Sequence, residues 1–252
     1  MLEVGLPAGL QGIIFSISNV LIQSSINSFG SLVMAGNTAA SNIEGFVYTS
    51  MNAVYQTSLS FTSQNFGARK YDRIDKILLE CLAIVTVVGL VLGQGAYFFG
   101  QQLLSIYSSD EKCYSKFGID RLAIISTMYC LCGIMDTLVG SLRGVGYSIL
   151  PMLVSLTGVC VIRVIWIFTV FKSVHTTFSL YISYPITWVI TLVAHGICFM
   201  VCVNEFEEWH DEKGIDLGDS NTWGYDPRGY FQRYDLTYKD YLNDLVAGWM
   251  FF

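Results

Sequence analysis

The sequence is poor in charged residues. Only 13% of its 252 residues are Asp, Glu, Lys or Arg, whereas a soluble domain carries about 25%. Hydrophobic residues make up 53% of the chain, and the mean hydropathy is +0.50. This composition argues against an ordinary soluble enzyme and against a disordered chain, and it favours a membrane protein.

Several chemical signatures are also missing. No stripe of Lys and Arg is present that could neutralise phosphates, so we expect no nucleic acid partner. The nucleotide-binding pattern G-x-x-x-x-G-K-[ST] does not occur, and no Ser/His/Asp or Cys/His set is spaced for hydrolysis, so we do not expect an enzyme. The seven Cys include no CxxC pair, and we therefore expect neither a metal site nor a bound cofactor.

The few charges are unevenly placed along the chain. Residues 1–203 contain 10 Lys and Arg against 9 Asp and Glu, whereas residues 204–252 contain 4 against 11. The first region is therefore nearly neutral and apolar, and the second is acidic. We expect residues 1–203 to form a membrane domain, and residues 204–252 to form an acidic soluble tail that is disordered or partly helical.

Six stretches are apolar enough to cross a bilayer, which takes about 20 residues in a helix. We expect an all-α membrane protein with crossings over residues 6–27, 32–61, 77–99, 119–142, 148–171 and 178–203, of which the second is the most polar. The loops after the second and fourth crossings carry Arg69, Lys70, Arg73, Lys76 and Arg143, and the opposite loops carry Lys112, Lys116, Arg121 and Lys172. The positive cluster after the second crossing predicts that both termini are cytoplasmic, in a plasma (inner) membrane protein.

Polar side chains recur on one face of three of the predicted helices. At 100° per residue, the members of each stripe fall within about 80° of one another, and lipid cannot satisfy them. The stripes predict a substrate cavity lined by Ser16, Asn19, Gln23, Asn27, Asn37, Ser41, Tyr48, Asn52, Tyr55 and Tyr129. The alternative is that these side chains only hold the helices together by hydrogen bonds.

Two carboxylates, Glu44 and Asp136, lie inside predicted crossings. A carboxylate at the centre of a bilayer costs about 3 kcal/mol or more on insertion scales, so such groups are usually retained for a task. We therefore predict that Asp136 and Glu44 bind a coupling cation or a proton. The alternative is a structural bridge from either carboxylate to Arg143 or Arg163.

Other side chains in the crossings have less specific explanations. We expect Arg163 to reach the membrane surface or to hold a backbone carbonyl. Tyr184 and Trp188 are expected to be aromatic residues at the membrane interface or in helix packing.

Several short motifs, in order along the chain, resemble the multidrug and toxic compound extrusion (MATE) family. Residues 64–68 (QNFGA), followed by residues 72–74 (DRI), are similar to that family's Q-N-x-G-A…R-I loop. Residues 140–146 (GSLRGVG), followed by residues 151–152 (PM), are similar to its L-R-G-x-G-x…P-M element. The motif residues for which we expect structural roles are Pro7, Gln64, Asn65, Gly67, Ala68, Arg73, Arg143, Gly144, Gly146, Pro151, Arg163 and Pro185.

The resemblance covers residues 4–203, about four-fifths of the chain, and implies one six-helix lobe, the second of two, in a twelve-helix bundle. The family exchanges Na⁺ or H⁺ for organic compounds that are often cationic. The resemblance therefore implies cation-coupled efflux of drugs, with small organic cations as substrates. Its further partners are membrane lipid and either a separate first lobe or a second copy of the chain. Some members carry a carboxylate in the helix that corresponds to residues 6–27, and this sequence has none at its middle.

Two other functions remain open from the sequence. One is a flippase for lipid-linked saccharides from the same superfamily, although such cavities are typically richer in Lys and Arg than these crossings. The other is a remnant that transports nothing.

Overall fold

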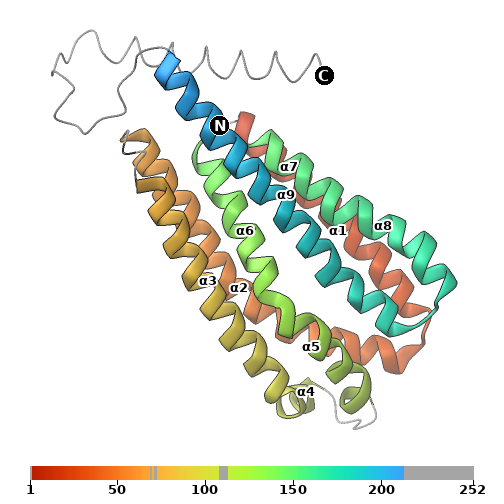
Figure 1. Cartoon of the computed structure of the whole chain (residues 1–252). Coiled ribbons are helices and arrows are strands. Elements are labelled where there is room, and N and C mark those ends of the chain that lie inside the picture. Colours follow the sequence, from red (N-terminus) through yellow and green to blue (C-terminus); the bar gives the residue numbers. More distant parts are fainter. Residues whose placement is uncertain (1, 69, 71–72, 108–112, 213–252) are drawn as a thin grey trace. The chain divides into compact units, whose positions relative to one another are not determined.

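All the regular structure in the described part of the chain is helical (Figure 1). The computed structural model describes residues 2–68, 70, 73–107 and 113–212. The helices are α1 (Leu2–Asn27), α2 (Ser31–Gly67), α3 (Ile74–Phe98), α4 (Gly100–Tyr107), η2 (Cys113–Gly118), α5 (Ile119–Ile125), η3 (Ser126–Met128), α6 (Tyr129–Gly144), α7 (Ile149–Ser155), η4 (Leu156–Val161), α8 (Ile162–Trp166), η5 (Ile167–Phe171) and α9 (Thr177–Glu212). The all-α fold class is therefore confirmed.

Four helical stretches in the described residues are long and apolar enough to cross a membrane. They run over Ile74–Phe98, Lys116–Gly144, Ile149–Phe171 and Thr177–Cys202, and they overlap the last four predicted crossings. The apolar stretch of α1, Gly12–Asn27, is shorter, and α2 is long enough but more polar. The chain is thus a multi-pass membrane protein, and the count of six crossings stays a prediction.

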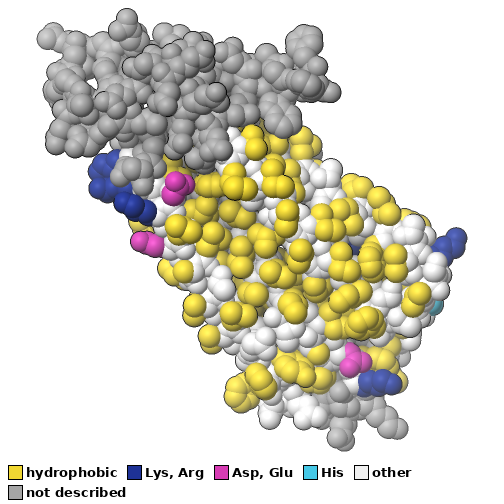
Figure 2. Space-filling view, in the orientation of Figure 1, with side chains coloured by type: hydrophobic (Ala, Val, Ile, Leu, Met, Phe, Trp, Pro, Cys, Tyr) yellow, Lys and Arg dark blue, Asp and Glu magenta, His cyan; other side chains and the backbone are white. Residues whose placement is uncertain are grey.

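The surface agrees with a lipid environment. Large hydrophobic side chains on several helices are more than half exposed, among them Val20, Phe46, Val91 and Phe168. On the face shown in Figure 2, hydrophobic side chains cover the middle of the helical region, and Lys, Arg, Asp and Glu lie toward its ends. An apolar surface of this extent is typical of a protein that contacts lipid or another protein.

The chain divides into two compact units, Met1–Met200 and Val201–Phe252. The first unit contains the helices that concern the site. Of the predicted acidic tail, residues 204–212 continue α9 and the remainder lies outside the described residues.

Within Met1–Met200 the helices form two groups (Figure 1). In the first group, α2, α3 and α6 pack side by side around Ala40, Val47, Met51 and Val85. The second group contains α1, the helical stretch from α7 to η5, and α9. Its hydrophobic core includes Ile22, Ile26, Phe171 and Leu180. A further cluster that contains Met135, Val159 and Trp188 joins the two groups.

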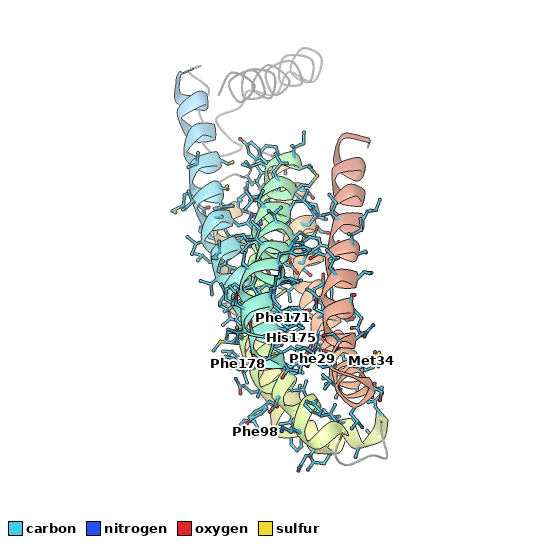
Figure 3. All side chains as sticks on the ribbon, turned by 90° about the vertical axis from the view of Figure 1, so that its right-hand side faces the viewer. Phe29, Met34, Phe98, Phe171, His175 and Phe178 are labelled. Carbon is cyan, nitrogen blue, oxygen red and sulfur yellow. The ribbon has the colours of Figure 1, made fainter. Side chains whose placement is uncertain are left out.

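Aromatic side chains close the end of the second group next to the turn between α1 and α2. The ring of Phe29 lies 5.8 Å from that of Phe171 and 4.7 Å from that of His175, measured between centroids (Figure 3). In the same turn Gly30 has a φ of 96°, which residues with a side chain rarely adopt. These contacts fix the point at which the chain passes from one helix group to the other.

The motif residues lie at helix ends and helix crossings. Gln64, Asn65 and Gly67 form the last turn of α2, and the N–H of Ala68 donates to the carbonyl oxygen of Gln64 at 2.9 Å. Arg73 immediately precedes α3.

The second motif shapes the turn between α6 and α7. Gly146 has a φ of 108°, so it needs the conformational freedom of glycine. A Cβ at Gly144 would lie 2.7 Å from the Cβ of Thr62 on α2. Pro151 occupies the first turn of α7, where a proline is tolerated. Pro185 lies inside α9. Pro7 lies inside α1, and its side chain is outside the described part of the structure.

Glycines on α3 set the distance between α3 and α6. A Cβ at Gly89 would lie 2.8 Å from the Cα of Cys130, and a Cβ at Gly93 would overlap the carbonyl oxygen of Ser126. Small residues at such crossings allow helix backbones to approach closely in membranes. The packing of α3 against α6 therefore requires glycine, which has no Cβ, at these two positions.

We expect Gly89→Ala to lower the melting temperature of the purified protein in detergent. The added methyl group meets backbone atoms of Cys130, and overpacking of this kind costs about 1–3 kcal/mol. The matched control is Gly95→Ala on the same helix, where a Cβ has no atom within 4 Å. The control should be neutral or stabilising by up to about 1 kcal/mol. Equal melting of the two variants would contradict the close approach of α3 and α6.

Candidate functional site

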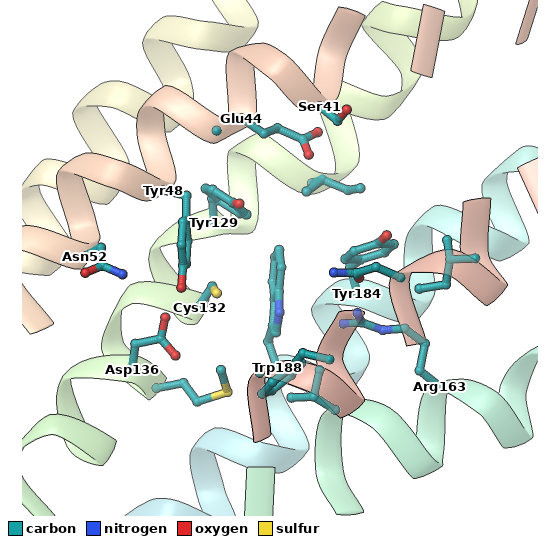
Figure 4. Close-up of a pocket in the computed structure, with 18 of the residues that line it drawn as sticks. Ser41, Glu44, Tyr48, Asn52, Tyr129, Cys132, Asp136, Arg163, Tyr184 and Trp188 are labelled. Carbon is teal, nitrogen blue, oxygen red and sulfur yellow. The ribbon is translucent and has the colours of Figure 1, made fainter. Parts of the chain in front are cut away.

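A cavity of about 670 Å³ lies between the two helix groups of the first unit. Its wall is built from residues of α1, α2, α5, α6, η4, α8 and α9. Figure 4 shows part of it, with side chains of α2 and α6 on one side and those of α8 and α9 on the other. Its volume is within the range of about 300–1,000 Å³ that is typical of small-molecule sites.

Most of the predicted cavity residues lie on this wall. They are Asn19, Gln23, Asn37, Ser41, Tyr48, Asn52, Tyr55 and Tyr129. Ser16 and Asn27 do not. The Ser16 hydroxyl donates to the carbonyl oxygen of Gly12 at 2.9 Å, and Asn27 accepts from the Gln23 amide at 3.1 Å. Viewed down the axis of α1 at 100° per residue, the residues on the cavity wall span an arc with Ile22 at one edge and Gln23 at the other. Ser16 and Asn27 lie just outside this arc, beyond Gln23.

Glu44 forms an ion pair with Arg121. Nε of Arg121 donates to one carboxylate oxygen at 2.9 Å, and Nη2 donates to the other at 2.6 Å. Glu44 is 4% exposed and Arg121 is 6% exposed, so the pair is buried. The partner of Glu44 is therefore neither Arg143 nor Arg163. The placement of Arg121 among the loop charges was wrong, because the residue lies inside α5.

A signal for Arg121 is present in the sequence. Arg121, Tyr129, Asp136 and Arg143 follow one another at helical spacing, and all of them lie on the cavity wall. A face of this kind keeps charged groups away from lipid. The polar face of the fourth crossing thus begins at Arg121, two turns before Tyr129, the first residue of that crossing that we predicted to line the cavity.

The ion pair is part of a larger polar network. Nη1 of Arg121 donates to Oδ1 of Asn37, and the Asn37 amide donates to Oε1 of Gln23 at 3.3 Å. The guanidinium also lies 5.7 Å from the ring centroid of Tyr184. Arg121 thereby connects α5 with α1, α2 and α9.

Asp136 differs from Glu44 in its surroundings. It lies on α6 next to Cys132, with Tyr48 facing it from α2 (Figure 4). In the part of the chain that the structure describes, its carboxylate has no cation within ion-pair distance and no hydrogen bond. A carboxylate on a cavity wall without a cation partner is able to take up a proton, a metal cation or a cationic group.

Two further guanidinium groups lie on the wall. Nη1 of Arg143 donates to the hydroxyl of Tyr55 at 2.9 Å. Nη2 of Arg163 donates to the hydroxyl of Thr187 at 2.9 Å. Arg163 is only 3% exposed. In the described part of the chain its hydrogen bond goes to a side chain and not to a backbone carbonyl, because the α8 face that carries it is turned toward α9 and the cavity.

Aromatic rings contribute a further part of the cavity wall. The ring of Trp188 lies 5.3 Å from that of Tyr129 and 5.9 Å from that of Tyr184, measured between centroids. Tyr184 and Trp188 had been expected at the membrane interface or in helix packing. Both pack in the cluster that joins the two helix groups, and both also contribute to the cavity wall. A wall of rings with a few charged groups suits an organic molecule that has both apolar and polar parts.

We expect Arg121→Gln to destabilise the protein strongly, because the charge of Glu44 would stay buried without its partner. Breaking one side of a buried ion pair costs about 3–5 kcal/mol. Glu44→Gln should also destabilise, and the double variant Glu44→Gln/Arg121→Gln should lose less stability than the sum of the two single variants. Thermal unfolding in detergent measures each effect, and Arg73→Gln, an exposed site before α3, is the control. Additive losses in the double variant would argue against the pair.

Comparison with known proteins shows which proteins the chain is similar to. The family model MatE matches residues 7–169. The chain is 22% identical over 197 residues to the probable multidrug resistance protein YoeA of Bacillus subtilis, an alignment that covers 77% of this chain and 42% of that protein. It is 26% identical over 110 residues to an FAD transporter of Shewanella oneidensis, which covers 44% of this chain and 24% of that protein.

The fold has solved counterparts. The crystal structure of the Vibrio cholerae MATE transporter VcmN in the bent form is similar with a TM-score of 0.71 and 16% identity, over 81% of this chain and 46% of that one. The chain thus spans less than half the length of these relatives. The resemblance noted from the motifs is confirmed. Since the family model matches well over half of its residues, this chain belongs to the MatE family.

Proposed function

We propose that this chain forms one half of a transporter that exports organic compounds in exchange for H⁺ or Na⁺. The observation that carries the proposal is the cavity, where Asp136 has no cation within ion-pair distance among the described residues and lies on a wall that also presents aromatic rings. Membership of the MatE family supports efflux transport. The coupling ion and the substrate class are our own assignment.

The exchange depends on competition for Asp136. When the carboxylate is charged, it attracts a cationic group of the transported compound. When it has bound a proton or Na⁺, that attraction is lost and the compound is released. The membrane potential supplies about 2.3 kcal/mol for each charge that crosses 100 mV.

Asp136 suits this role better than Glu44 does. Both carboxylate oxygens of Glu44 accept hydrogen bonds from Arg121, and a competing ion would have to break that pair. The role predicted for Glu44 in ion coupling therefore stays a prediction. Its geometry supports a different task, which is to hold α2 and α5 together at the cavity.

In this proposal the other half of the transporter is supplied by a separate polypeptide. The chain spans less than half of its relatives, so a complete pathway requires a first lobe or a second copy of the chain to face the cavity. The plasma membrane location and the cytoplasmic termini remain predictions from the placement of Lys and Arg.

Asp136→Asn should abolish drug resistance in cells that express the chain together with a first lobe. The substitution keeps the size of the side chain but removes its charge, so neither a coupling ion nor a cationic group is held. Resistance should fall to the level of cells without the chain, while the amount of protein in the membrane stays the same. Asp75→Asn, an exposed carboxylate at the start of α3, is the control and should keep full resistance. Unchanged resistance in Asp136→Asn would count against the exchange mechanism.

A water-filled passage should make Ser41 accessible from water. In a background without other Cys, Ser41→Cys should react with a membrane-impermeant thiol reagent, because the residue lies on the cavity wall. Ser58→Cys on the same helix should not react, since Ser58 is 0% exposed and donates to the carbonyl oxygen of Thr137. Mass spectrometry of the labelled protein measures both. Equal protection of the two positions would mean that the cavity is sealed.

A further inference from the structure

Exposed basic side chains gather where α2 is followed by α3. They are Lys70, Arg73 and Lys76, here called the basic cluster, and all three are exposed. Residues 69–76 carry four Lys and Arg against two Asp, whereas the chain as a whole has a net charge of -6. Figure 2 shows Lys and Arg side chains gathered at the end of the helical region where α3 begins in Figure 1. The cluster is therefore a local reversal of the overall charge.

The backbone holds the basic cluster together. The N–H of Arg73 donates to the carbonyl oxygen of Lys70 at 3.1 Å, so one turn joins these two residues. Arg73 directly precedes α3 and Lys76 lies in its first turn, and residues three apart on a helix are neighbours on its surface. Among the described residues none of the three forms an ion pair with a carboxylate, and this includes Asp75 in the same turn. Their charges are thus available to an anion from outside the chain.

The basic cluster lies where the chain enters the membrane. The apolar stretch of α3 that is long enough to cross a bilayer begins at Ile74, directly after Arg73. Leu79, one turn beyond Lys76, is 66% exposed. The side chain of Arg73 does not cap the first turn of α3, and the positive end of the helix dipole adds to the attraction for an anion. A ligand at this point therefore meets basic groups directly beside an apolar helix surface.

We propose that Lys70, Arg73 and Lys76 bind the phosphate group of an anionic phospholipid, whose acyl chains lie along the exposed apolar side of α3. Guanidinium and ammonium groups both bind phosphate oxygens. A zwitterionic lipid offers the same phosphate, but its own cation repels the cluster. Anionic lipids are found in the cytoplasmic leaflet, on the side that the placement of Lys and Arg predicts for this loop. The proposal goes beyond the transport function and does not depend on it, because none of these residues lines the cavity.

The test compares two lipids that have the same acyl chains and different headgroups. Palmitoyl-oleoyl phosphatidylglycerol and palmitoyl-oleoyl phosphatidylcholine are titrated separately into the purified full chain in detergent, and native mass spectrometry measures the bound lipid. A basic residue near an anionic lipid strengthens binding about fivefold, so phosphatidylglycerol should bind at least about tenfold tighter. This comparison uses the unchanged protein, so it does not depend on how a variant folds. Equal binding of the two lipids, or tighter binding of phosphatidylcholine, would overturn the proposal.

Two matched double variants then locate the effect. Arg73→Gln/Lys76→Gln should reduce the preference for phosphatidylglycerol to about twofold or less. Lys116→Gln/Lys172→Gln removes the same amount of charge at exposed sites in η2 and after η5, and it should keep the preference. All four side chains are exposed, so we expect both variants to melt at the temperature of the unchanged protein. If the two variants lose the preference equally, the lipid responds to the total charge of the chain, and the basic cluster is not the site.

A soluble headgroup distinguishes a lipid from free phosphate. Glycerol 3-phosphate carries the same anionic group without acyl chains, and so it makes no contact with the apolar side of α3. Even in large excess it should leave most of the phosphatidylglycerol bound in the same mass spectrometry measurement. Complete displacement of the lipid would mean that the basic cluster binds free phosphate, and the assignment to a phospholipid would be wrong.

Discussion

The buried pair of Glu44 and Arg121 is the interaction on which the arrangement around the cavity depends. In a membrane neither side chain can be solvated by lipid, so each needs the other. The guanidinium group offers more donors than the carboxylate can accept, and the additional bond goes to Asn37, which in turn contacts Gln23. One ion pair thereby fixes three helices, α1, α2 and α5, at a single point on the cavity wall.

Close packing in the first helix group complements this polar network. Glycines on α3 and α6 remove side chains where backbones cross, so that α2, α3 and α6 form a tight layer on one side of the cavity. The polar faces of α2 and α6 then have no helix of their own group against them. They face the second group, whose α8 and α9 contribute Arg163, Tyr184 and Trp188. The cavity is the space that remains between the two polar surfaces.

The three arginines of the wall illustrate how the environment differentiates identical side chains. Arg121 has a carboxylate partner, Arg143 bonds to a tyrosine hydroxyl on the face that also carries Asp136, and Arg163 has only neutral contacts among the described residues. A buried charge with a partner is satisfied within the fold, whereas a buried charge without one is available to a ligand. The same difference separates the structural role of Glu44 from the exchange role proposed for Asp136.

Much of the fold was predictable from local sequence. Hydropathy and length located the last four crossings, because a helix in lipid must be apolar over about 20 residues. Helical spacing placed eight of the ten predicted polar residues on the wall that the structure contains, because side chains three and four residues apart share a face. The motif residues Gly67 and Gly144 lie at the ends of α2 and α6, a few residues beyond the predicted ends of these crossings at residues 61 and 142.

The partners of the charged groups were decided only by the tertiary structure. Glu44 and Arg121 are 77 residues apart in the chain, and no local pattern indicates that they meet. Likewise, the spacing of Trp188 and Arg163 is equally consistent with a face toward lipid, toward another helix or toward a cavity. Period and hydropathy describe one helix at a time, whereas the direction in which a helix turns its face depends on how all the helices pack together.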